Sequence, residues 1–596
     1  MYAERDFYVI YMNAKLGQKG SMILHYKEYL FAIAILFAFW AFGIGSTYGF
    51  SIFPDEFAYW SYAARFAGYD WSDVNALAPY YSYGYSLILI PIFAFCRDAV
   101  MAYRIAVSIN FLLLFLALIA LAGIVKRMVP DKKMPIALFS VLTVLFPCNL
   151  FYTQMTLTEI LIFALYIAAG SVLYHYLENN RLSTLILLML ILIYLYTVHM
   201  RTVGVLLAAM IVVTMHILFR GNRRWHILAA LGVTLLLFAA ADFLKQMAFV
   251  YVYAGINQEL AAFNDYGGQM EKVRYILSLE GFYDLLISLA GKVLYLGLAT
   301  WGLFYWGVYG LVRQALALLR NIKKRVSAEP QQFFAVFVLL TVAAQIVIAT
   351  IYLLTLGEIG DYTYGRYSEM VIPFVMVWGF VVLWRERARF VWIATGGLAL
   401  LQGLTTFLVV RQIIATGADN FQGYFLVGIS YLYNEADFQV DSFYAAAYLF
   451  CELLTVMVTA MALFCRSHKK RQYLLAAFAV VELVLAMRAD IIYLEPFKKA
   501  AFRDSRMVDK MQVLQEEGRR IIYMDQVSPP YVGILQFMGR DLDIQVMERR
   551  EAVADYAEDI TDEDILIFAF DDVFLEEWED KYARKDVYGH FALLYD

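Results

Sequence analysis

Residues 105–125 read IAVSINFLLLFLALIALAGIV, a strongly apolar stretch without a charged side chain. A helix of about 20 mostly apolar residues is long enough to cross the hydrocarbon core of a membrane. Comparable runs lie at residues 29–50, 134–150, 157–177, 183–199, 203–219, 226–243, 292–318, 332–355, 370–384, 391–410, 442–465 and 472–490. Together these runs predict a polytopic α-helical membrane protein with about 13 transmembrane helices.

The composition also indicates a membrane protein. Of the 596 residues, 62% are hydrophobic and only 17% are charged, which is more apolar material than the core of a soluble protein absorbs. The 45 Tyr, 45 Phe and 10 Trp residues suit helix ends at a membrane interface. A net charge of -5 argues against a nucleic-acid partner, because such a protein needs a basic face. Neither a disulfide framework nor a zinc site fits the spacing of the four cysteines, Cys96, Cys148, Cys451 and Cys465.

The basic residues predict the orientation of the chain. Alternate segments between the apolar runs, beginning with residues 1–28, carry 23 Lys and Arg residues, whereas the longer intervening segments carry 9. Basic loops mark the cytoplasmic side. This count requires that residues 83–96, which include Pro91, form an interfacial or re-entrant helix and do not cross. We therefore expect a cytoplasmic segment at 1–28, without a removed signal peptide, and a membrane domain at 29–490 with outer loops at 51–104 and 244–291.

The last hundred residues differ from the rest of the chain. Residues 497–596 hold 13 Lys and Arg residues against 23 Asp and Glu residues. Short apolar runs predict strands at 520–525, 542–547, 564–570 and 590–595, and helices are expected at about 498–517 and 573–584. We expect residues 491–596 to form a small extracytoplasmic α/β domain. The sequence of this domain contains no Walker motif or catalytic Ser/His arrangement.

Acidic and aromatic residues gather at the predicted outer ends of the helices. Asp55 and Glu56 directly follow the first apolar run, after Pro54, which can stop a helix. The loop continues with aromatic and polar residues, including Tyr59, Arg65, Tyr81 and Tyr83. Ionisable residues at membrane depth are costly and usually functional. Carboxylates beside aromatic rings suit sugar binding, because the rings pack on C–H faces and the acids bond hydroxyls. The alternative for Asp55 and Glu56 is a solvated helix end.

A third acid and two arginines share this side of the predicted bundle. Glu159 could face Asp55, or it could be a helix-start acid that favours the local dipole, with Thr156 as the cap. Arg201, beside His199, and Arg366, beside Tyr367, lie where the charge rule disfavours basic residues. Each arginine could bind a phosphate or anchor the helix to lipid head groups. Two or three carboxylates can hold a divalent metal, so Mg or Mn between Asp55 and Glu159 stays open, although no obligatory cofactor is expected.

With these residues in place, the sequence resembles the multi-spanning glycosyltransferases of the GT-C fold, which include lipid A aminoarabinose transferases and protein O-mannosyltransferases. The resemblance covers about residues 20–410 and leaves the C-terminal domain outside. It rests on the Asp55-Glu56 pair, the aromatic outer loop, Met101-Ala102-Tyr103-Arg104, Glu159 after Pro147, Arg201, and Gly365-Arg366-Tyr367. A Trp-Trp-Asp-Tyr-Gly motif is absent, which weighs against an oligosaccharyltransferase.

The resemblance implies transfer of one sugar from a polyprenyl-phosphate carrier to an acceptor hydroxyl at the outer face, usually with inversion. Asp55 would be the general base, and Glu56 and Glu159 would orient it and bond hydroxyls. Arg201, Arg366 and Tyr367 would bind the lipid phosphate. Weaker candidates for contacts with sugar or acceptor are Tyr59, Arg65, Tyr81, Tyr83 and His199. The expected location is a prokaryotic cytoplasmic (inner) membrane.

Two other classes of protein stay open. A flippase or transporter of lipid-linked saccharides would need polar groups near mid-membrane and often inverted repeats, but no repeat is visible here. An outer-face glycan ligase or polymerase would be expected to carry basic residues in a large late outer loop, and residues 411–441 hold only Arg411. A structural role accounts for the remaining possibilities. The sugar and the acceptor, whether a glycan, a glycolipid or a protein, are not defined by the sequence.

Overall fold

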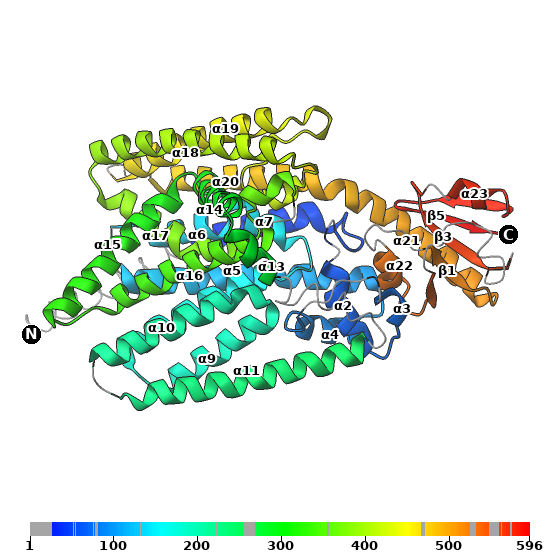
Figure 1. The fold of residues 1–596 in the computed structure, drawn as a ribbon, viewed down its shortest axis with the longest axis horizontal. Helices are drawn as coiled ribbons and strands as arrows, with labels where there is room; N and C mark the ends of the chain where they lie inside the picture. Colours follow the sequence, from blue (N-terminus) through cyan, green and yellow to red (C-terminus); the bar gives the residue numbers. More distant parts are fainter. Residues whose placement is uncertain are drawn as a thin grey trace, which may run out of the picture.

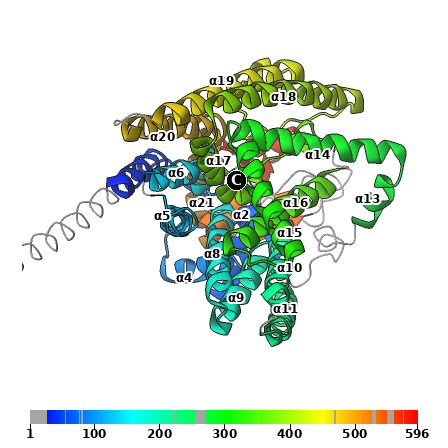
Figure 2. The same ribbon diagram turned by 90° about the vertical axis from the view of Figure 1, so that its left-hand side faces the viewer.

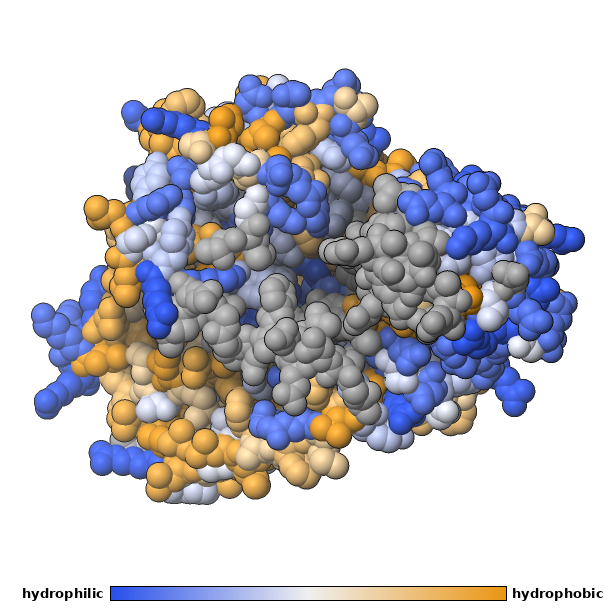
Figure 3. Space-filling view, turned by 45° about the vertical axis from the view of Figure 1, so that its right-hand side comes forward, coloured by the Kyte–Doolittle hydropathy of each residue, from blue (hydrophilic) through white to orange (hydrophobic). Residues whose placement is uncertain are grey.

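The protein is a long bundle of helices with a small sheet domain at one end (Figure 1). The computed structural model describes residues 27–596 except 52, 54, 76, 78–81, 132, 221–222, 254–268, 355–356, 467–470, 525–531, 548–559, 562 and 573–574. On the face shown in Figure 3, hydrophobic side chains gather over the helical part and hydrophilic ones over the sheet domain. This division fits a bundle in lipid that carries a domain in water.

The predicted helical membrane architecture is confirmed. Within the described ranges, nine helices are long and apolar enough to cross a membrane. They are Lys27–Ile44, α5 (Ala99–Met128), α8 (Glu159–Asn179), Met200–Arg220, which comprises η1 (Met200–Thr202) and α10 (Val203–Arg220), α11 (Trp225–Val252), α14 (Leu279–Ala299), α16 (Pro330–Leu353), α18 (Ala388–Thr416) and α19 (Val440–Cys465).

The other predicted crossings coincide with helices that are bent, shorter or more polar. The helices α6 (Ile136–Val144) and α7 (Pro147–Thr153) form a bent pair whose axes meet at 53°, and together they are long and apolar enough for either a broken span or a re-entrant loop. Pro147 starts α7, where its missing N–H is not needed. The remaining predicted runs form α9 (Leu182–Val198), α15 (Leu303–Lys324), α17 (Ile372–Arg385) and α20 (Arg471–Ala489).

The predicted crossing at 292–318 is wrong, because the chain breaks inside it. Helix α14 ends at Ala299 and α15 begins at Leu303. Between them, Trp301 (φ 53°) and Gly302 (φ 79°) are left-handed, a conformation that ends an α-helix. Helix α14 is seen nearly end-on in Figure 1 and lengthwise in Figure 2, so it lies across the direction of α5, α10 and α15. Helix α14 is therefore long enough to span a membrane, but its axis is transverse to the axes of these other helices.

The run at 83–96 forms α4 (Ser86–Phe95), a helix of 10 residues. Ten residues span about 15 Å, roughly half the hydrocarbon thickness, which agrees with the prediction that this run does not cross. Helix α4 packs against α2 (Asp55–Phe66), which follows the first apolar helix (Figure 1). Other short elements are α3 (Ser72–Asn75), α13 (Gln269–Ile276), η3 (Ile359–Thr363), η4 (Glu369–Val371), η5 (Gly423–Phe425), η6 (Glu435–Asp437) and the π-helix η7 (Asp490–Leu494).

The C-terminal residues form the predicted small α/β domain. Its sheet has the strand order β2-β1-β3-β5-β4. Strand β1 (Ile521–Met524) pairs in parallel with β2 (Ile544–Met547) and β3 (Ile565–Ala569), and β5 (Phe591–Tyr595) pairs antiparallel with β3 and β4 (Arg584–Val587). The helices are α21 (Glu495–Glu516), α22 (Val532–Met538) and α23 (Leu575–Glu579). Sequence patterns missed β4, because this exposed edge strand reads Arg-Lys-Asp-Val and has no apolar alternation.

Helix α22 joins this domain to the membrane part. The ring of Phe537 lies 4.7 Å from that of Phe50, 4.9 Å from that of Trp60 and 6.2 Å from that of Tyr103, measured between centroids. Just after α22, Arg540 donates to the carbonyl of Phe93 at 3.0 Å. Because Trp60 belongs to α2, the C-terminal domain packs directly against the helix that begins with the predicted catalytic acid.

Replacing Phe537 by Ala should destabilise the protein by about 3–5 kcal/mol, the usual cost of emptying a buried aromatic site. The side chain is fully buried among four aromatic residues of the membrane part. The measurement is the unfolding midpoint of purified protein in lipid nanodiscs. Phe570→Ala in the same domain is the control, since that ring is 55% exposed. Equal midpoints for both variants would contradict this account of the interface.

Candidate active site

Four charged side chains form a continuous row of ion pairs. Arg366 donates from Nη2 to Oδ2 of Asp55 at 2.8 Å and from Nε to Oε1 of Glu159 at 2.7 Å. Arg201 donates from Nη2 to the same oxygen of Glu159 at 3.0 Å. Acids and bases thus alternate in the order Asp55, Arg366, Glu159 and Arg201. The structure brings together four residues that the sequence placed at four separate outer positions.

Four different parts of the chain supply these side chains. Asp55 is the first residue of α2 and Glu159 the first of α8, so both acids sit where helix dipoles favour negative charge. Arg201 lies in η1, and Arg366 lies in the turn between η3 and η4. Gly365 permits that turn, because a Cβ there would lie 2.0 Å from the ring of Tyr295.

The row is buried and incompletely bonded. Arg201 and Arg366 are each 4% exposed and Glu159 is 5% exposed. Within the described ranges, Nε and Nη1 of Arg201 and Oε2 of Glu159 have no hydrogen-bond partner. Buried polar atoms are nearly always bonded in folded proteins. Two unused donors and one unused acceptor in the same cluster are what a binding site for a polar ligand provides.

The protonation states favour an anionic ligand near the arginines. Burial would lower the pKa of Arg366, but Glu159 and Asp55 outweigh it and hold that pKa well above its ordinary value. Burial, and then the nearby Arg201, place the pKa of His199 well below its usual range. His199 is therefore neutral at physiological pH, and its Nδ1 accepts a hydrogen bond from the backbone N–H of Arg201 at 3.3 Å.

Aromatic rings flank the charged row. The guanidinium carbon of Arg366 lies 4.4 Å from the ring centre of Phe53, and that of Arg201 lies 4.5 Å from the ring centre of Tyr367. These distances suit cation–π contacts that hold both guanidinium planes. Tyr59 is buried on α2 four residues after Asp55, and burial, followed by the charge of Asp55, raises its pKa well above the usual value. Tyr59 therefore keeps its phenolic proton.

Glu56 points away from the row and is bonded entirely by protein groups. One carboxylate oxygen accepts from the Ser51 amide at 2.7 Å and hydroxyl at 2.5 Å. The other accepts from the Tyr103 hydroxyl at 2.5 Å and from the amide and hydroxyl of Thr156 at 2.8 and 2.6 Å. Burial raises the pKa of Glu56. The alternative that Thr156 caps the next helix is wrong, because Thr158 is the N-cap residue of α8.

Two weaker candidates do not reach the row in the structure. Arg65 pairs with Asp70 at 3.3 Å and donates to the carbonyl of Tyr251 at 3.2 Å. It lies ten residues after Asp55 on α2, which is about 15 Å along a helix. Tyr83 donates to the carbonyl of Ala241 on α11 at 3.1 Å. Tyr81 lies outside the described residues.

Sequence analysis missed a buried acid beside this site. Glu369 follows Arg366 by three residues, is 3% exposed, and accepts a hydrogen bond from the hydroxyl of Tyr295. Burial raises its pKa to about 7. The available signal was its position at the start of an apolar run, the same signal that identified Glu159.

The arrangement does not favour a metal between the two proposed ligands. Asp55 and Glu159 both bond the guanidinium of Arg366, which lies between them where a shared cation would be needed. In the part of the chain that the structure describes, no group of three or more His, Cys, Asp or Glu side chains could hold a metal ion. We therefore assign no chemical step to a metal.

No protein-family model and no curated protein matches the sequence. Among solved structures, apo ArnT from Cupriavidus metallidurans matches with a TM-score of 0.53 and 13% identity, over 97% of this chain and 98% of that chain. ArnT is a lipid A aminoarabinose transferase of the GT-C fold. This chain has the GT-C fold. A second structure, ArnT from Cupriavidus metallidurans bound to undecaprenyl phosphate, matches with a TM-score of 0.51 and 12% identity, over 95% of this chain and 97% of that chain.

The likeness to the GT-C fold is wider than the sequence indicated. The resemblance seen in the sequence ended at about residue 410, whereas the structural match covers nearly the whole chain. The C-terminal sheet domain is therefore included in the GT-C likeness. The two sequences are only 13% identical, so the likeness of the C-terminal domain is visible in the arrangement of its elements and not in sequence motifs.

Proposed function

We propose that this protein is a glycosyltransferase that moves one sugar from a polyprenyl-phosphate donor to an acceptor hydroxyl at the outer face of a cytoplasmic membrane. The observation that carries the proposal is the buried row of Asp55, Arg366, Glu159 and Arg201, with two unused donors on Arg201. The GT-C fold and the undecaprenyl phosphate bound to ArnT support the choice of donor.

The arginines suit the phosphate of the donor. Arg201 offers Nε and Nη1, which have no partner among the described residues, and an arginine fork matches phosphate oxygens. Arg366 lies on the other side of Glu159 and carries a firmly held positive charge. As the bond to the sugar breaks, negative charge grows on the phosphate, so fixed cations beside it stabilise the transition state more than the ground state.

Asp55 suits the role of general base. It lies at the exposed end of the row, with 15% of its side chain accessible, whereas Glu159 is enclosed between two arginines. The acceptor oxygen forms a bond to the anomeric carbon, and the bond from that carbon to the phosphate oxygen breaks. The polyprenyl phosphate leaves with the bonding electrons, and Asp55 takes the hydroxyl proton. Attack opposite the leaving group gives inversion.

Glu56 acts as a positioning residue in this proposal. Two of its five hydrogen bonds come from Ser51, and the other three tie the first turn of α2 to Tyr103 of α5 and to Thr156, which precedes α8. Asp55 starts α2 and Glu159 starts α8, so the Glu56 contacts help to set the distance between the proposed base and its neighbouring acid. Adjacent residues on a helix face directions about 100° apart, which lets Asp55 and Glu56 serve different networks.

The test uses purified protein in lipid nanodiscs with polyprenyl phosphate and, as a matched control, the uncharged polyprenol. We expect binding of the phosphate and at least tenfold weaker binding of the alcohol. Radiolabelled polyprenyl-phosphate sugars would then be incubated with this protein and membranes from a deletion strain. Transfer of label to a glycan, glycolipid or protein that the deletion strain lacks would establish the activity. Absence of both phosphate-dependent binding and transfer would leave a transporter or structural role.

A further inference from the structure

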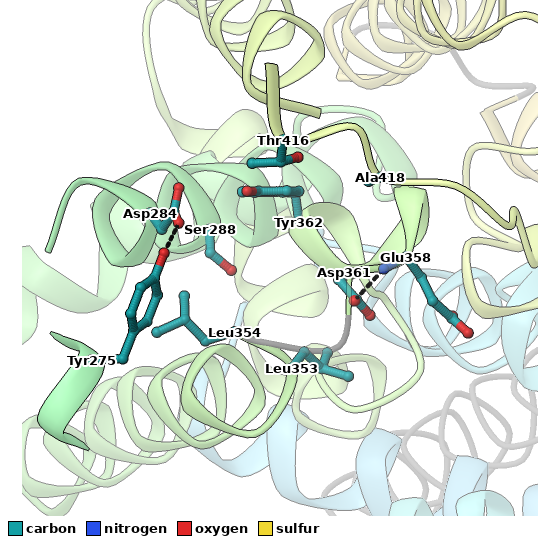
Figure 4. Close-up of a pocket in the computed structure, with 11 residues that line it drawn as sticks. Tyr275, Asp284, Ser288, Leu353, Leu354, Glu358, Asp361, Tyr362, Thr416 and Ala418 are labelled. Carbon is teal, nitrogen blue, oxygen red and sulfur yellow. Dashed lines mark hydrogen bonds between the residues drawn. The ribbon is translucent and has the colours of Figure 1, made fainter. Parts of the chain in front are cut away.

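A second polar site lies beside the charged row. An open pocket of about 240 Å³ is lined by residues of α13, α14, the end of α16, η3 and the end of α18 (Figure 4). Drug-sized ligands occupy pockets of about 300–1,000 Å³, so this cavity suits a smaller molecule such as one sugar ring. Its lining combines acids, hydroxyls and two tyrosine rings, with leucines opposite Tyr362 in Figure 4.

The side chain of Asp361 is directed at the cavity by a backbone contact. Its Oδ2 accepts from the amide of Glu358 at 2.9 Å, and no described group donates to Oδ1. The residue is 6% exposed, and burial raises its pKa to about 6. A buried carboxylate oxygen without a donor is expected to bond a ligand or water. Asp361 therefore offers an acceptor inside the cavity.

Ser288 provides a donor. The Ser288 hydroxyl accepts from Lys292 at 2.9 Å, so its own proton can point into the cavity. Glu358, in contrast, is bonded by protein groups: its Oε1 accepts from Asn420 and Gln422 at 3.2 and 3.0 Å, and its side chain also accepts from the backbone N–H of Asp361 in a capping box. Across the cavity, Asp284 is bonded by Tyr275 (Figure 4). The described lining holds no cationic side chain, which disfavours a phosphate.

One short segment connects the cavity with the charged row. Glu358, Asp361 and Tyr362 line the cavity, and Arg366 follows Tyr362 by four residues in the chain. The segment is packed tightly, since a Cβ at Gly291 of α14 would lie 2.4 Å from the carbonyl oxygen of Tyr362. The ring of Tyr352, one residue before the cavity-lining Leu353, lies 5.7 Å from that of Tyr367.

From this geometry we propose that the cavity is a sugar-binding subsite that takes one neutral, hydroxyl-rich ring of the donor or the acceptor. The carboxylate of Asp361 accepts from a ring hydroxyl, Ser288 donates, and the tyrosines pack on C–H faces. The subsite rests on the proposed function, because a glycosyltransferase must hold a second sugar or a sugar-bearing acceptor beside its phosphate site.

The experiment measures binding of methyl glycosides to the full-length protein in nanodiscs by saturation-transfer NMR. The panel contains methyl glycosides of glucose, galactose, mannose and N-acetylglucosamine, with ethanolamine as a small cation. Asp361→Asn should weaken glycoside binding about tenfold, the scale of one hydrogen bond to a charged group. Ala418→Trp should abolish it, because Ala418 lines the cavity and indole would fill it. Ala415→Trp, exposed and outside the lining, is the matched control.

Thr416→Trp, at a lining position that is exposed, replaces Ala418→Trp if that variant unfolds. Unchanged glycoside binding in the lining variants, or ethanolamine binding as strong as glycoside binding, would overturn the subsite. So would absence of glycoside binding in protein that still binds polyprenyl phosphate. Failure to bind polyprenyl phosphate would instead overturn the proposed function. If Ala418→Trp changes the KM of only one substrate, the donor or the acceptor, the ring bound in the subsite belongs to that substrate.

Discussion

Replacing Asp55 by Asn is expected to lower the turnover number by about 10² or more, the scale of general-base loss. The amide keeps the shape of the carboxylate and can still contact Arg366, but it cannot accept the acceptor's proton. Folding and polyprenyl-phosphate affinity should change little, because the proposed phosphate ligands are Arg201 and Arg366. The measurement is single-turnover transfer of radiolabelled sugar, with phosphate binding determined on the same preparation.

Asp70→Asn provides a matched control for that result. Asp70 lies in the same outer segment and pairs with Arg65, but both side chains are solvent-accessible and lie away from the charged row. We expect full activity from this control. A turnover number for Asp55→Asn within a few-fold of that for Asp70→Asn would show that another group removes the proton, and Asp55 would then be a binding residue only.

Periodicity and length predicted most of the helices and four strands, because apolar runs and their polar boundaries are local properties. These patterns failed where tertiary packing determines where a helix breaks or a strand forms. Residues 292–318 are mostly apolar and suggested one crossing, yet the left-handed pair Trp301 and Gly302 divides them between a transverse helix and a second helix. Strand β4 forms because β5 supplies its hydrogen bonds, and no apolar pattern marks it.

The charged row was predictable for a physical reason. Asp55, Glu159, Arg201 and Arg366 stand at helix ends or in turns beside apolar runs, where charge is costly unless it is paired, so each was conspicuous alone. Sequence could not show the pairing, or that Arg366 lies between both acids. Nor could it show where Glu56 points. The sequence analysis expected Glu56 to bond sugar or acceptor hydroxyls, whereas the helix turns Glu56 towards Tyr103 and Thr156.

Replacing Arg366 by Ala is expected to have the largest effect on the site, because two acids depend on this one side chain. Without Arg366, Asp55 loses this ion pair, and Glu159 keeps only its ion pair with Arg201. Breaking a buried ion pair by removing one partner costs about 3–5 kcal/mol. Polyprenyl-phosphate affinity should also fall by about tenfold to a hundredfold, since hydrogen bonds to charged groups contribute about 1.5–3 kcal/mol.

A double variant separates these two effects. Asp55→Asn combined with Arg366→Met removes one negative and one positive charge and keeps the Glu159–Arg201 pair at 3.0 Å intact. The double variant should therefore recover most of the lost stability, while phosphate affinity stays low and transfer stays absent. Arg97→Ala, at an exposed position between α4 and α5, is the arginine control and should match the wild type in both measurements. Normal phosphate affinity in Arg366→Ala would place the lipid phosphate elsewhere, and recovery of phosphate affinity in the double variant would show that Arg366 acts only by neutralising Asp55.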